Sequence, residues 1–507
     1  MRKNETGVNY LGRIQSIKNK RFVVQSVSPI VEQSYLEKSL SRLLQIKEGT
    51  IFAIEHVTDY GVRGLLDQLT QEGFVSKYGE GYIFCDYPRI NYAGIIFLLN
   101  SETSDSQRAW GYTLPHESSE ISLFKALFEA LERHATYYSP FIQSVEYPIF
   151  KKGDASFLYD LIPHFSKEQL KKFPFLVGGV HQLKNVLGFS AKSLLTGKKN
   201  FLPVSVFYYG KALITNEMPA MFDPTSSGSG AGQTLESATL SALYEMIERD
   251  HFLLYWFSGI TPQEIVYDSV TSPLGVYVTS MRVRYNLEVR FFNIGYDYNV
   301  KAVFCVVIDP VLNIIACGAK VGQNAELVME GALLEAIAVL GSLRGRDERG
   351  DFLALKKILN ENVFLDESLD RKKRVNMYCS SEGIDLVRSR WLDKKHSIID
   401  FESFSKESIV FASKKEELAF MLKNCKEFFK KNGEGYDVFF HEHSSKYVKK
   451  IGCRVVHVFI PALLKLHLLE PMATPLSKRL VIFAQSKGDK CLSGEEISLF
   501  SLPHFFP

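Results

Sequence analysis

Apolar and polar positions along the chain fall into two patterns, one typical of buried strands and the other of amphipathic helices. Apolar residues spaced three or four positions apart predict helices. Strands interspersed with such helices are typical of an α/β (α+β) domain, which we place at residues 96–507 and expect to contain a mixed sheet. Short runs rich in apolar and β-branched residues predict its strands at residues 91–100, 202–210, 287–296, 301–310 and 313–322.

The first 95 residues predict a smaller, winged-helix-like module. Residues 34–46 and 61–74 have helical apolar spacing, and "VSKYGEGYIF" at residues 75–84 predicts a hairpin around Gly-Glu-Gly. The second helix carries Arg63 close to Asp67 and Glu72, a charge pattern that does not favour contacts with DNA phosphates. Docking of a peptide and a purely structural role are the two alternatives for this module.

One pattern of apolar and acidic residues is written twice in full and a third time in part. "KALFEALERH" begins at Lys125 and "SALYEMIERD" begins at Ser241. A third copy, "GALLEAIAVLGSLRGR", begins at Gly331 and has Ala338 and Val339 where the others have Glu and Arg. All three segments have the spacing of amphipathic helices.

The two complete copies each gather acidic and basic side chains on one helix face, because positions i, i+3 and i+4 project together. A single helix of this kind would usually be an exposed face laced with ion pairs. Here the acids stand among apolar residues and the pattern recurs, so the carboxylates would repel one another unless a cation lay between them. The side chains concerned are Glu129, Glu132 and Arg133 in the first helix and Glu245, Glu248 and Arg249 in the second.

A glycine-rich segment, "SSGSGAGQTLESA", precedes the second of these helices. Its Gly228, Gly230 and Gly232 allow backbone amides to approach an anion at the N-terminus of a helix. Divalent ions that prefer oxygen ligands, such as Mg²⁺ carrying a nucleoside triphosphate, suit carboxylates in this setting. The loop alone is weak support, but together with the acidic helix it predicts a nucleotide and metal site.

Composition restricts the class of protein. The 507 residues exceed one ordinary domain, and the net charge of +3 arises from 60 basic and 57 acidic residues. That balance does not favour general binding to nucleic acid or to a membrane surface. The seven cysteines include no Cys-x-x-Cys pair, and neither a signal-peptide core nor a membrane span is evident. We therefore expect a cytoplasmic protein with reduced thiols, no nucleic-acid partner and no membrane partner.

The stretch "SGSGAGQTLESATLSALYEMIERDHFLLYW" resembles the signature of the YcaO superfamily. "KALFEALERH" is similar to the earlier acidic helix of that family, and "RVVHVFIPALLKLH" and the terminal "LPHFFP" are similar to its closing segments, so that the likeness covers residues 111–507. YcaO proteins use Mg²⁺ and ATP to phosphorylate a backbone amide oxygen of a peptide. The resemblance implies ATP and Mg²⁺ as cofactors and a ribosomally synthesised precursor peptide as substrate.

The resemblance also implies roles for individual residues. Glu129, Glu132, Glu245 and Glu248 would bind Mg²⁺. Pro503 and Pro507 would belong to an ordered catalytic tail near the active site. The residues implied at the nucleotide are Arg133, Arg249, Ser226, Ser229 and the acid Glu236.

Three features depart from the family pattern. The usual acid eight residues before Glu245 is Ser237, and its neighbour Glu236 would lie on the opposite face of the helix unless the helix begins after it. The third helix has Ala338 and Leu340 where the family has Gln and Arg. Arg344 and Arg346 are candidate substitutes. Phe505 replaces the middle proline of the Pro-x-Pro-x-Pro tail, which removes a fixed backbone angle.

The leading hypothesis is ATP- and Mg²⁺-dependent cyclodehydration of Cys, Ser or Thr to azolines, as in thiazole/oxazole-modified peptide and bacteriocin biosynthesis. A variant that forms a thioamide or amidine is one alternative. A non-catalytic scaffold or precursor-binding subunit is the other, and the departures above favour it. Residues 1–95 are too short for an E1-like domain, so an E1-like or leader-binding partner would be a separate chain. A homodimer is a further option.

Overall fold

The chain forms two compact units, residues 1–130 and 131–507, and the division between them falls within the sequence of helix α4 (Ser119–Thr136). None of the described helices is long and apolar enough to cross a bilayer. The structure, a computed structural model, describes residues 61–83, 89–99, 106–115, 117–137, 159–179, 181–182, 188–210, 213, 220–267, 272–344, 365–367, 371–406, 408–474, 476–488, 503–504 and 506.

The first unit contains helix α3 (Gly61–Gln71) and an antiparallel sheet of β1 (Val75–Ile83), β2 (Ile90–Leu98) and β3 (Ser106–Thr113), in that order. The predicted helix at residues 61–74 and the predicted strand at 91–100 are confirmed. The predicted hairpin at residues 75–84 is wrong, because β1 is one strand that pairs with β2 along its length. Glycines permit a turn but do not impose one, and the continuous ladder satisfies the backbone. The predicted helix at residues 34–46 lies outside the described residues.

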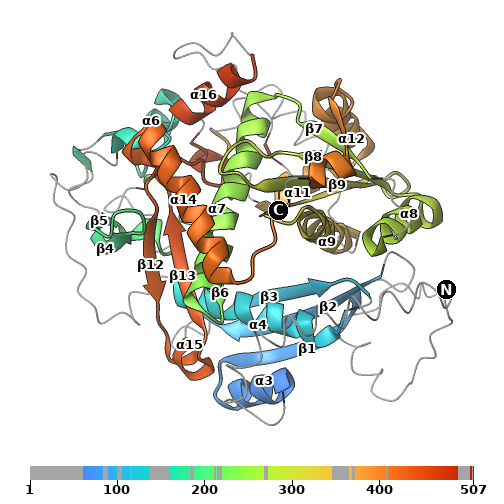
Figure 1. Ribbon diagram of the computed structural model, residues 1–507, viewed down its shortest axis with the longest axis horizontal. Coiled ribbons are helices and arrows are strands. Elements are labelled where there is room, and N and C mark those ends of the chain that lie inside the picture. Colours follow the sequence, from blue (N-terminus) through green and yellow to red (C-terminus); the bar gives the residue numbers. More distant parts are fainter. Residues whose placement is uncertain are drawn as a thin grey trace, which may run out of the picture. The chain divides into compact units, whose positions relative to one another are not determined.

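The second unit contains two five-stranded sheets, ordered β10-β9-β8-β7-β11 and β5-β4-β12-β13-β6 (Figure 1). Strands of the first sheet are β7 (Gln263–Val266), β8 (Glu288–Asn293), β9 (Lys301–Asp309), β10 (Ile314–Gly322) and β11 (Ile398–Asp400). Strands of the second are β4 (Gly188–Ser193), β5 (Lys199–Pro203), β6 (Ser229–Gly232), β12 (Phe439–His443) and β13 (Arg454–Phe459).

Most predicted strands of this unit are confirmed, and the described part of the chain has the mixed helices and sheets of an α+β protein. The exception is the predicted strand at residues 202–210. Strand β5 ends at Pro203 and a 3₁₀ helix, Val204–Val206, follows it. Proline has no backbone N–H to donate to a ladder, which accounts for the strand ending there.

Helices fill the space around these sheets. The longer ones are α7 (Leu235–Ser258), α8 (Pro273–Tyr285), α9 (Ala325–Arg344) and α14 (Lys414–Asn432). The shorter ones are α6 (Lys167–Lys172), α11 (Arg371–Met377), α12 (Ser381–Val387), α13 (Phe401–Ser405), α15 (Lys446–Ile451) and α16 (Lys478–Ser486).

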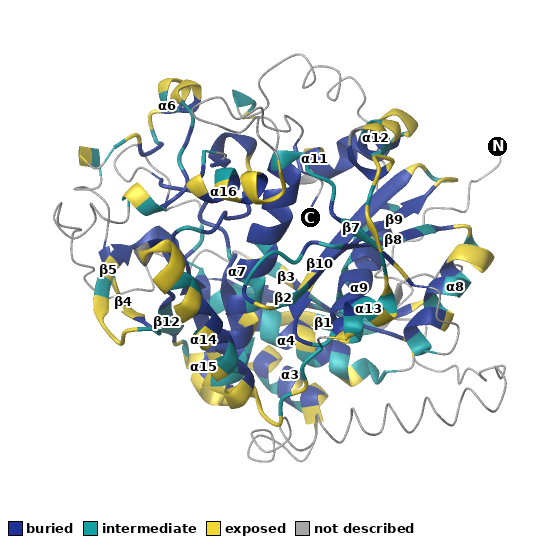
Figure 2. Ribbon diagram, turned by 45° about the horizontal axis from the view of Figure 1, so that its top comes forward, coloured by how far each residue is buried: buried dark blue, intermediate teal, exposed yellow. Residues whose placement is uncertain are grey.

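Helix α7 is the central element of the second unit. It contacts β9 and β10 of one sheet and β6 and β13 of the other (Figure 1). It is buried along most of its length (Figure 2), as expected of a helix that is apolar on nearly all sides. A capping box between Thr234 and Ser237 begins it, and Gly259 ends it in the left-handed region at φ 65°.

The repeated sequence pattern is a repeated strand-and-helix unit. In each copy, the glutamate at the same position accepts a backbone N–H from the strand region before its helix. Within the first unit Trp110 donates to Glu129 (2.5 Å). In the second unit Gly228 donates to Glu245 and Ala319 to Glu335 (3.4 Å).

Glycines in these strands allow the helices to lie directly on them. A Cβ added to Gly111 would lie 1.9 Å from the carbonyl oxygen of Ser122 in α4. A Cβ on Gly230 would lie 2.6 Å from the amide nitrogen of Ala242 in α7. Gly230 is therefore explained by close packing of strand on helix, a simpler account than the predicted contact with an anion.

Candidate functional site

Helix α7 gathers two carboxylates around one arginine. Arg249 Nη1 lies 3.1 Å from Glu248 Oε1, and Arg249 Nη2 lies 3.5 Å from Glu245 Oε1. The three side chains share a face, as their i, i+3 and i+4 spacing predicts. One arginine faces two carboxylates, so the face has excess negative charge.

Burial makes that excess charge costly. The pKa of Glu248 is raised to about 7, mainly by burial and also by neighbouring Glu335, although Arg249 offsets part of the shift. Burial likewise raises the pKa of Glu245, although 26% of that side chain is exposed. Burial lowers the pKa of Arg249, but the surrounding carboxylates outweigh it and the net shift is upward. Solvent thus reaches a group of charges that is otherwise closely surrounded by protein.

Two residues of this cluster were not predicted from the sequence. Glu335 of α9 and Lys320 of β10 face the α7 cluster, with Lys320 Nζ 3.6 Å from Glu335 Oε1. The attraction of Glu335 is the largest cause of the raised pKa of Lys320, and Glu248 and Glu245 add to it. Glu335 occupies the position of Glu129 and Glu245 in the third copy of the pattern, so the copy itself could have indicated it.

The glycine-rich segment meets a further predicted carboxylate. Ser229 Oγ donates to Glu132 Oε1 at 2.6 Å, and it lies 2.6 Å from the carbonyl oxygen of Ser226. Ser229 is buried and Ser226 is half-buried. Arg133 is half-buried as well, and its carbonyl oxygen accepts the Tyr209 hydroxyl at 3.0 Å. The structure therefore brings Glu132, Ser226 and Ser229 together.

The predicted nucleotide contact of Glu236 is not supported by the helix geometry. Helix α7 begins at Leu235, before Glu236, so Glu236 points away from the face of Glu245. Ser237 Oγ accepts the Thr234 N–H in the capping box, a structural role. The half-buried Arg344 ends α9 and Arg346 lies outside the described residues, so neither is placed at the cluster.

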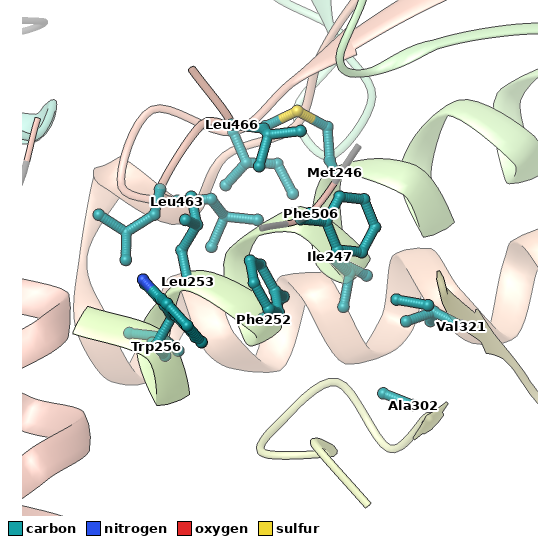
Figure 3. Packing of buried hydrophobic residues seen from close by; sticks show 14 of the residues in the cluster. Met246, Ile247, Phe252, Leu253, Trp256, Ala302, Val321, Leu463, Leu466 and Phe506 are labelled. Atoms are coloured by element: carbon teal, nitrogen blue, oxygen red, sulfur yellow. The ribbon is translucent and has the colours of Figure 1, made fainter. Parts of the chain in front are cut away.

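The C-terminal tail reaches the same helix. The Tyr378 hydroxyl donates to the carbonyl oxygen of Pro503 at 2.5 Å. The Arg249 guanidinium carbon lies 4.4 Å from the centre of the Phe506 ring, and Figure 3 shows this ring beside Met246 and Ile247 of α7. Phe506 is therefore a further contact of Arg249. Phe505 and Pro507 lie outside the described residues.

His504 of the tail joins a buried cluster with His467 and Glu470. It is the only group of metal-binding side chains with converging donor atoms in the described part of the chain. However, Arg374 Nη1 lies 3.0 Å from Glu470 Oε1 and already neutralises that carboxylate. His504 Nε2 lies 3.2 Å from the carbonyl oxygen of His467. We interpret the cluster as an anchor for the tail.

Other candidates in the described residues have structural explanations. His441 and His443 of β12 face aromatic rings, and burial lowers the pKa of His441 to about 4. Burial raises the pKa of the Cys305 thiol, which makes it a poor nucleophile. A hollow of about 430 Å³ is lined by Asn299, Val300, Lys301, Lys406, Ser408 and Ile409, none of which is a predicted site residue.

The cluster suits Mg²⁺ and a polyphosphate. Glutamate oxygens are ligands that Mg²⁺ prefers, and burial, followed by the neighbouring carboxylates, raises the pKa of Glu248 in spite of Arg249 and Lys320, so a bound cation would favour its charged form. Arg249 and Lys320 provide the cationic groups that phosphates require. The donor set therefore fits ATP with Mg²⁺, with Glu245, Glu248 and Glu335 available to the metal.

Comparison with known proteins points the same way. The family model described as YcaO cyclodehydratase, ATP- and Mg²⁺-binding, matches residues 116–464. No curated protein sequence matches the chain significantly.

Solved structures share the fold at low identity. The YcaO protein from Methanopyrus kandleri, bound with AMPPCP and Mg²⁺, is 13% identical with a TM-score of 0.55, over 80% of this chain and 91% of that one. A heterocyclase in complex with substrate and cofactor is 15% identical with a TM-score of 0.60. That alignment covers 86% of this chain but only 56% of the heterocyclase. A chain of the E. coli microcin synthetase McbBCD complex with pro-MccB17 bound is 13% identical with a TM-score of 0.51, over 79% of this chain and 96% of that one.

Proposed function

This chain belongs to the YcaO family, and we propose that it activates backbone amides of a ribosomally synthesised precursor peptide. ATP and Mg²⁺ are its cofactors, as the family description states. The reaction we favour is cyclodehydration of Cys, Ser or Thr to azolines. The cytoplasm, where thiols stay reduced, suits such a substrate.

The observation that carries this proposal is the charge cluster on α7. Glu245 and Glu248 lie close to Glu335 on α9, and burial keeps their pKa values high. Unneutralised buried carboxylates destabilise a fold, so a protein that retains them has a use for them. The family description and the side chains of the cluster both support binding of Mg²⁺ and a triphosphate.

The residues of the chain have distinct parts in this proposal. Glu245 and Glu248 would hold the metal, and Arg249, which pairs with both carboxylates and packs against Phe506, would orient them and supply positive charge for the phosphates. Ser229 holds Glu132 in place through its hydrogen bond. Bound ATP with Mg²⁺ supplies the phosphoryl group that converts an amide oxygen into a leaving group. The tail, held at Pro503 by Tyr378 and packed through Phe506 against Arg249, is assigned a part in catalysis beside this site.

A non-catalytic scaffold is the second candidate. Ala338 and Leu340, which stand where the family has Gln and Arg, are buried apolar residues of α9 and bind no phosphate. The neighbourhood of the gene separates the two functions. A short precursor rich in Cys, Ser and Thr beside a lone copy supports the enzyme, whereas a second, complete YcaO gene beside it supports the scaffold.

The similar solved structures support the proposal that this chain has partners. One similar structure is a heterocyclase with substrate, and another belongs to a complex that holds pro-MccB17. We propose that this chain likewise binds a precursor peptide together with a separate leader-binding or E1-like protein. Formation of a thioamide or amidine, and a homodimer, are alternatives that an assay with precursor and purified complex would separate.

Calorimetric titration with Mg²⁺ and ATP tests the proposal without knowledge of the peptide. The expected result is micromolar binding by the intact protein. The double variant Glu132→Ala, Glu248→Ala should lose this binding and keep its circular dichroism spectrum. Absence of binding by the folded, intact protein would reject the enzyme and leave the scaffold.

A further inference from the structure

Lys465 is a buried lysine whose ammonium group has no hydrogen-bond acceptor among the described residues. Only 6% of the residue is exposed. Its Nζ lies over the ring of Phe222, 4.3 Å from the centre, and 5.7 Å from the centre of the Phe459 ring. Aromatic faces attract a cation but do not accept the three hydrogen bonds that an ammonium can donate.

The backbone on both sides of Lys465 is fixed. Leu464 N–H donates to Asp250 Oδ1 of α7 at 2.9 Å, and Leu468 N–H donates to Asp223 Oδ2 at 2.7 Å. Leu466 packs beside Phe506 and α7 (Figure 3). The backbone that carries Lys465 is therefore anchored, and its side chain lies buried against Phe222 and Phe459.

The charges nearest to Lys465 belong to the α7 site and to the segment before the glycine-rich loop. Burial lowers the pKa of Lys465 to about 8, while Asp223 and Glu245 raise it and offset part of that effect. No carboxylate of the described residues accepts a hydrogen bond from the Lys465 ammonium group, so no direct partner neutralises its charge there. An isolated buried cation of this kind is expensive for the fold.

We propose that Lys465 binds an anionic phosphate group of the ligand in the α7 site. The inference rests on the proposed function and adds a residue to it. Lys465 would supply the positive charge that the third helix lacks, because Ala338 and Leu340 stand in place of polar residues there. Lys320 differs from it, since Lys320 is already paired with Glu335.

A binding role and a structural role predict opposite effects on stability. The folded-state pKa of Lys465 lies below its ordinary value of 10.5, so the unfolded chain holds the proton more tightly between about pH 8 and 10.5. The contribution of Lys465 therefore disfavours folding at neutral pH and fades as the pH rises through this range. Lys465→Met removes the buried charge and should raise the melting temperature of the ligand-free protein.

The experiment compares the intact protein with Lys465→Met, Lys465→Arg and, as a matched change of charge, Lys449→Met on the exposed side of α15. The probes are Mg²⁺ with ATP and inorganic triphosphate, titrated by calorimetry from pH 7 to 9.5. We expect Lys465→Met to bind both probes about tenfold to a hundredfold more weakly at pH 7. Lys449→Met should bind as the intact protein does.

The pH profile gives a second readout that a structural lysine would not change. Affinity of the intact protein should fall as the pH rises above about 8, where Lys465 loses its proton. Lys465→Met should lack this fall, and Lys465→Arg should retain affinity at pH 9.5 because arginine stays charged.

Failure of this inference differs from failure of the proposed function. If the intact protein binds and Lys465→Met binds equally well, with the same pH profile, Lys465 is not a ligand and the nucleotide site stands. A lower melting temperature for Lys465→Met would also overturn the inference, since it would show a structural lysine. If the folded, intact protein binds neither probe, the proposed function fails and the inference fails with it.

Discussion

Helix α7 carries two groups of charges on consecutive residues, and they differ in how well the protein satisfies them. Glu245, Glu248 and Arg249 form one group, and Asp250 and His251 begin the other. The first group has carboxylates with raised pKa values and solvent access. The second group is closed off from solvent and its charges are paired within the protein.

The paired group links three parts of the second unit: α7, α16 and the segment that carries Asp297. Arg479 of α16 donates through Nε to both oxygens of Asp250, at 2.9 and 2.8 Å. Arg479 Nη2 lies 2.7 Å from Asp297 Oδ2, and His251 Nε2 lies 2.7 Å from Asp297 Oδ1. Burial alone would raise the pKa of Asp297, but Arg479 and His251 outweigh it and the net shift is downward.

The contrast separates structural charges from functional ones. Where each buried charge has a partner, pKa values shift toward the charged form and the network stabilises the folded arrangement. Where carboxylates outnumber nearby cations, pKa values shift toward the neutral form, and an external cation would restore the charged form.

Removing Arg479, the cation that pairs with buried Asp250 and Asp297, should have the largest effect on stability. Arg479→Met leaves Asp250 and Asp297 buried without their cation, and we expect a loss of about 3–5 kcal/mol in the free energy of unfolding. Urea denaturation measures it. The charge-matched control is Lys478→Met, since Lys478 is the exposed neighbour of Arg479. An Arg479→Met midpoint equal to that of the control would contradict the structural role.

Removing a charge from the group of Glu245, Glu248 and Arg249 should weaken ligand binding without destabilising the fold. Glu248→Gln should lower the affinity for Mg²⁺ with ATP about 10- to 100-fold. In the intact protein without ligand, the raised pKa of Glu248 makes stability fall as the pH rises from about 4.5 to about 7. Glu248→Gln should lose this part of the pH dependence, which urea denaturation at several pH values would detect. A destabilised Glu248→Gln protein would place Glu248 in the structural group instead.

Metal binding should depend on pH through the same carboxylate. Because Mg²⁺ requires the deprotonated form, affinity of the intact protein should rise as the pH increases through about 7. ATP ionises in the same way in titrations of Glu248→Gln, so this variant serves as the control. Parallel profiles for the two proteins would show that Glu248 does not titrate on binding.

Lys320→Met should have a smaller effect. Lys320 is about half exposed and already paired with Glu335, so its loss should weaken the binding of Mg²⁺ with ATP only about three- to tenfold. Titration at low and high salt would check it, and the difference from the intact protein should shrink at high salt. A loss as great as that of Glu248→Gln would show that the β10 lysine is a principal phosphate ligand.

Glu236→Gln should have the smallest effect of all. This acid lies in the first turn of α7, on the face opposite Glu245, so affinity for Mg²⁺ with ATP should change less than about twofold. The same titration tests it. A tenfold loss would mean that Glu236 belongs to the site.

The sequence predicted the acidic helices and the strands of the second unit because their apolar periodicity is strong. It also contained Glu335, in the third copy of the pattern, although the replacement of Glu and Arg by Ala338 and Val339 obscured it. Lys320 and Lys465 could not be found this way, since each reaches the site from a distant segment through tertiary packing. The turn predicted at Gly-Glu-Gly failed because pairing with β2 outweighed the local preference for a turn.

A crossed thermal-shift measurement tests most directly the claim that α7 carries two independent groups of charges. The intact protein, Glu248→Gln and Asp250→Asn are each melted with and without Mg²⁺ and ATP. We predict that Asp250→Asn melts at a lower temperature but is still stabilised by the ligand, as mass action requires of a protein that binds. Glu248→Gln should melt no lower than the intact protein without ligand and gain little from its addition. The two groups would not be independent if the ligand stabilised Glu248→Gln as much as the intact protein, or if Asp250→Asn kept its full stability but lost its response to the ligand.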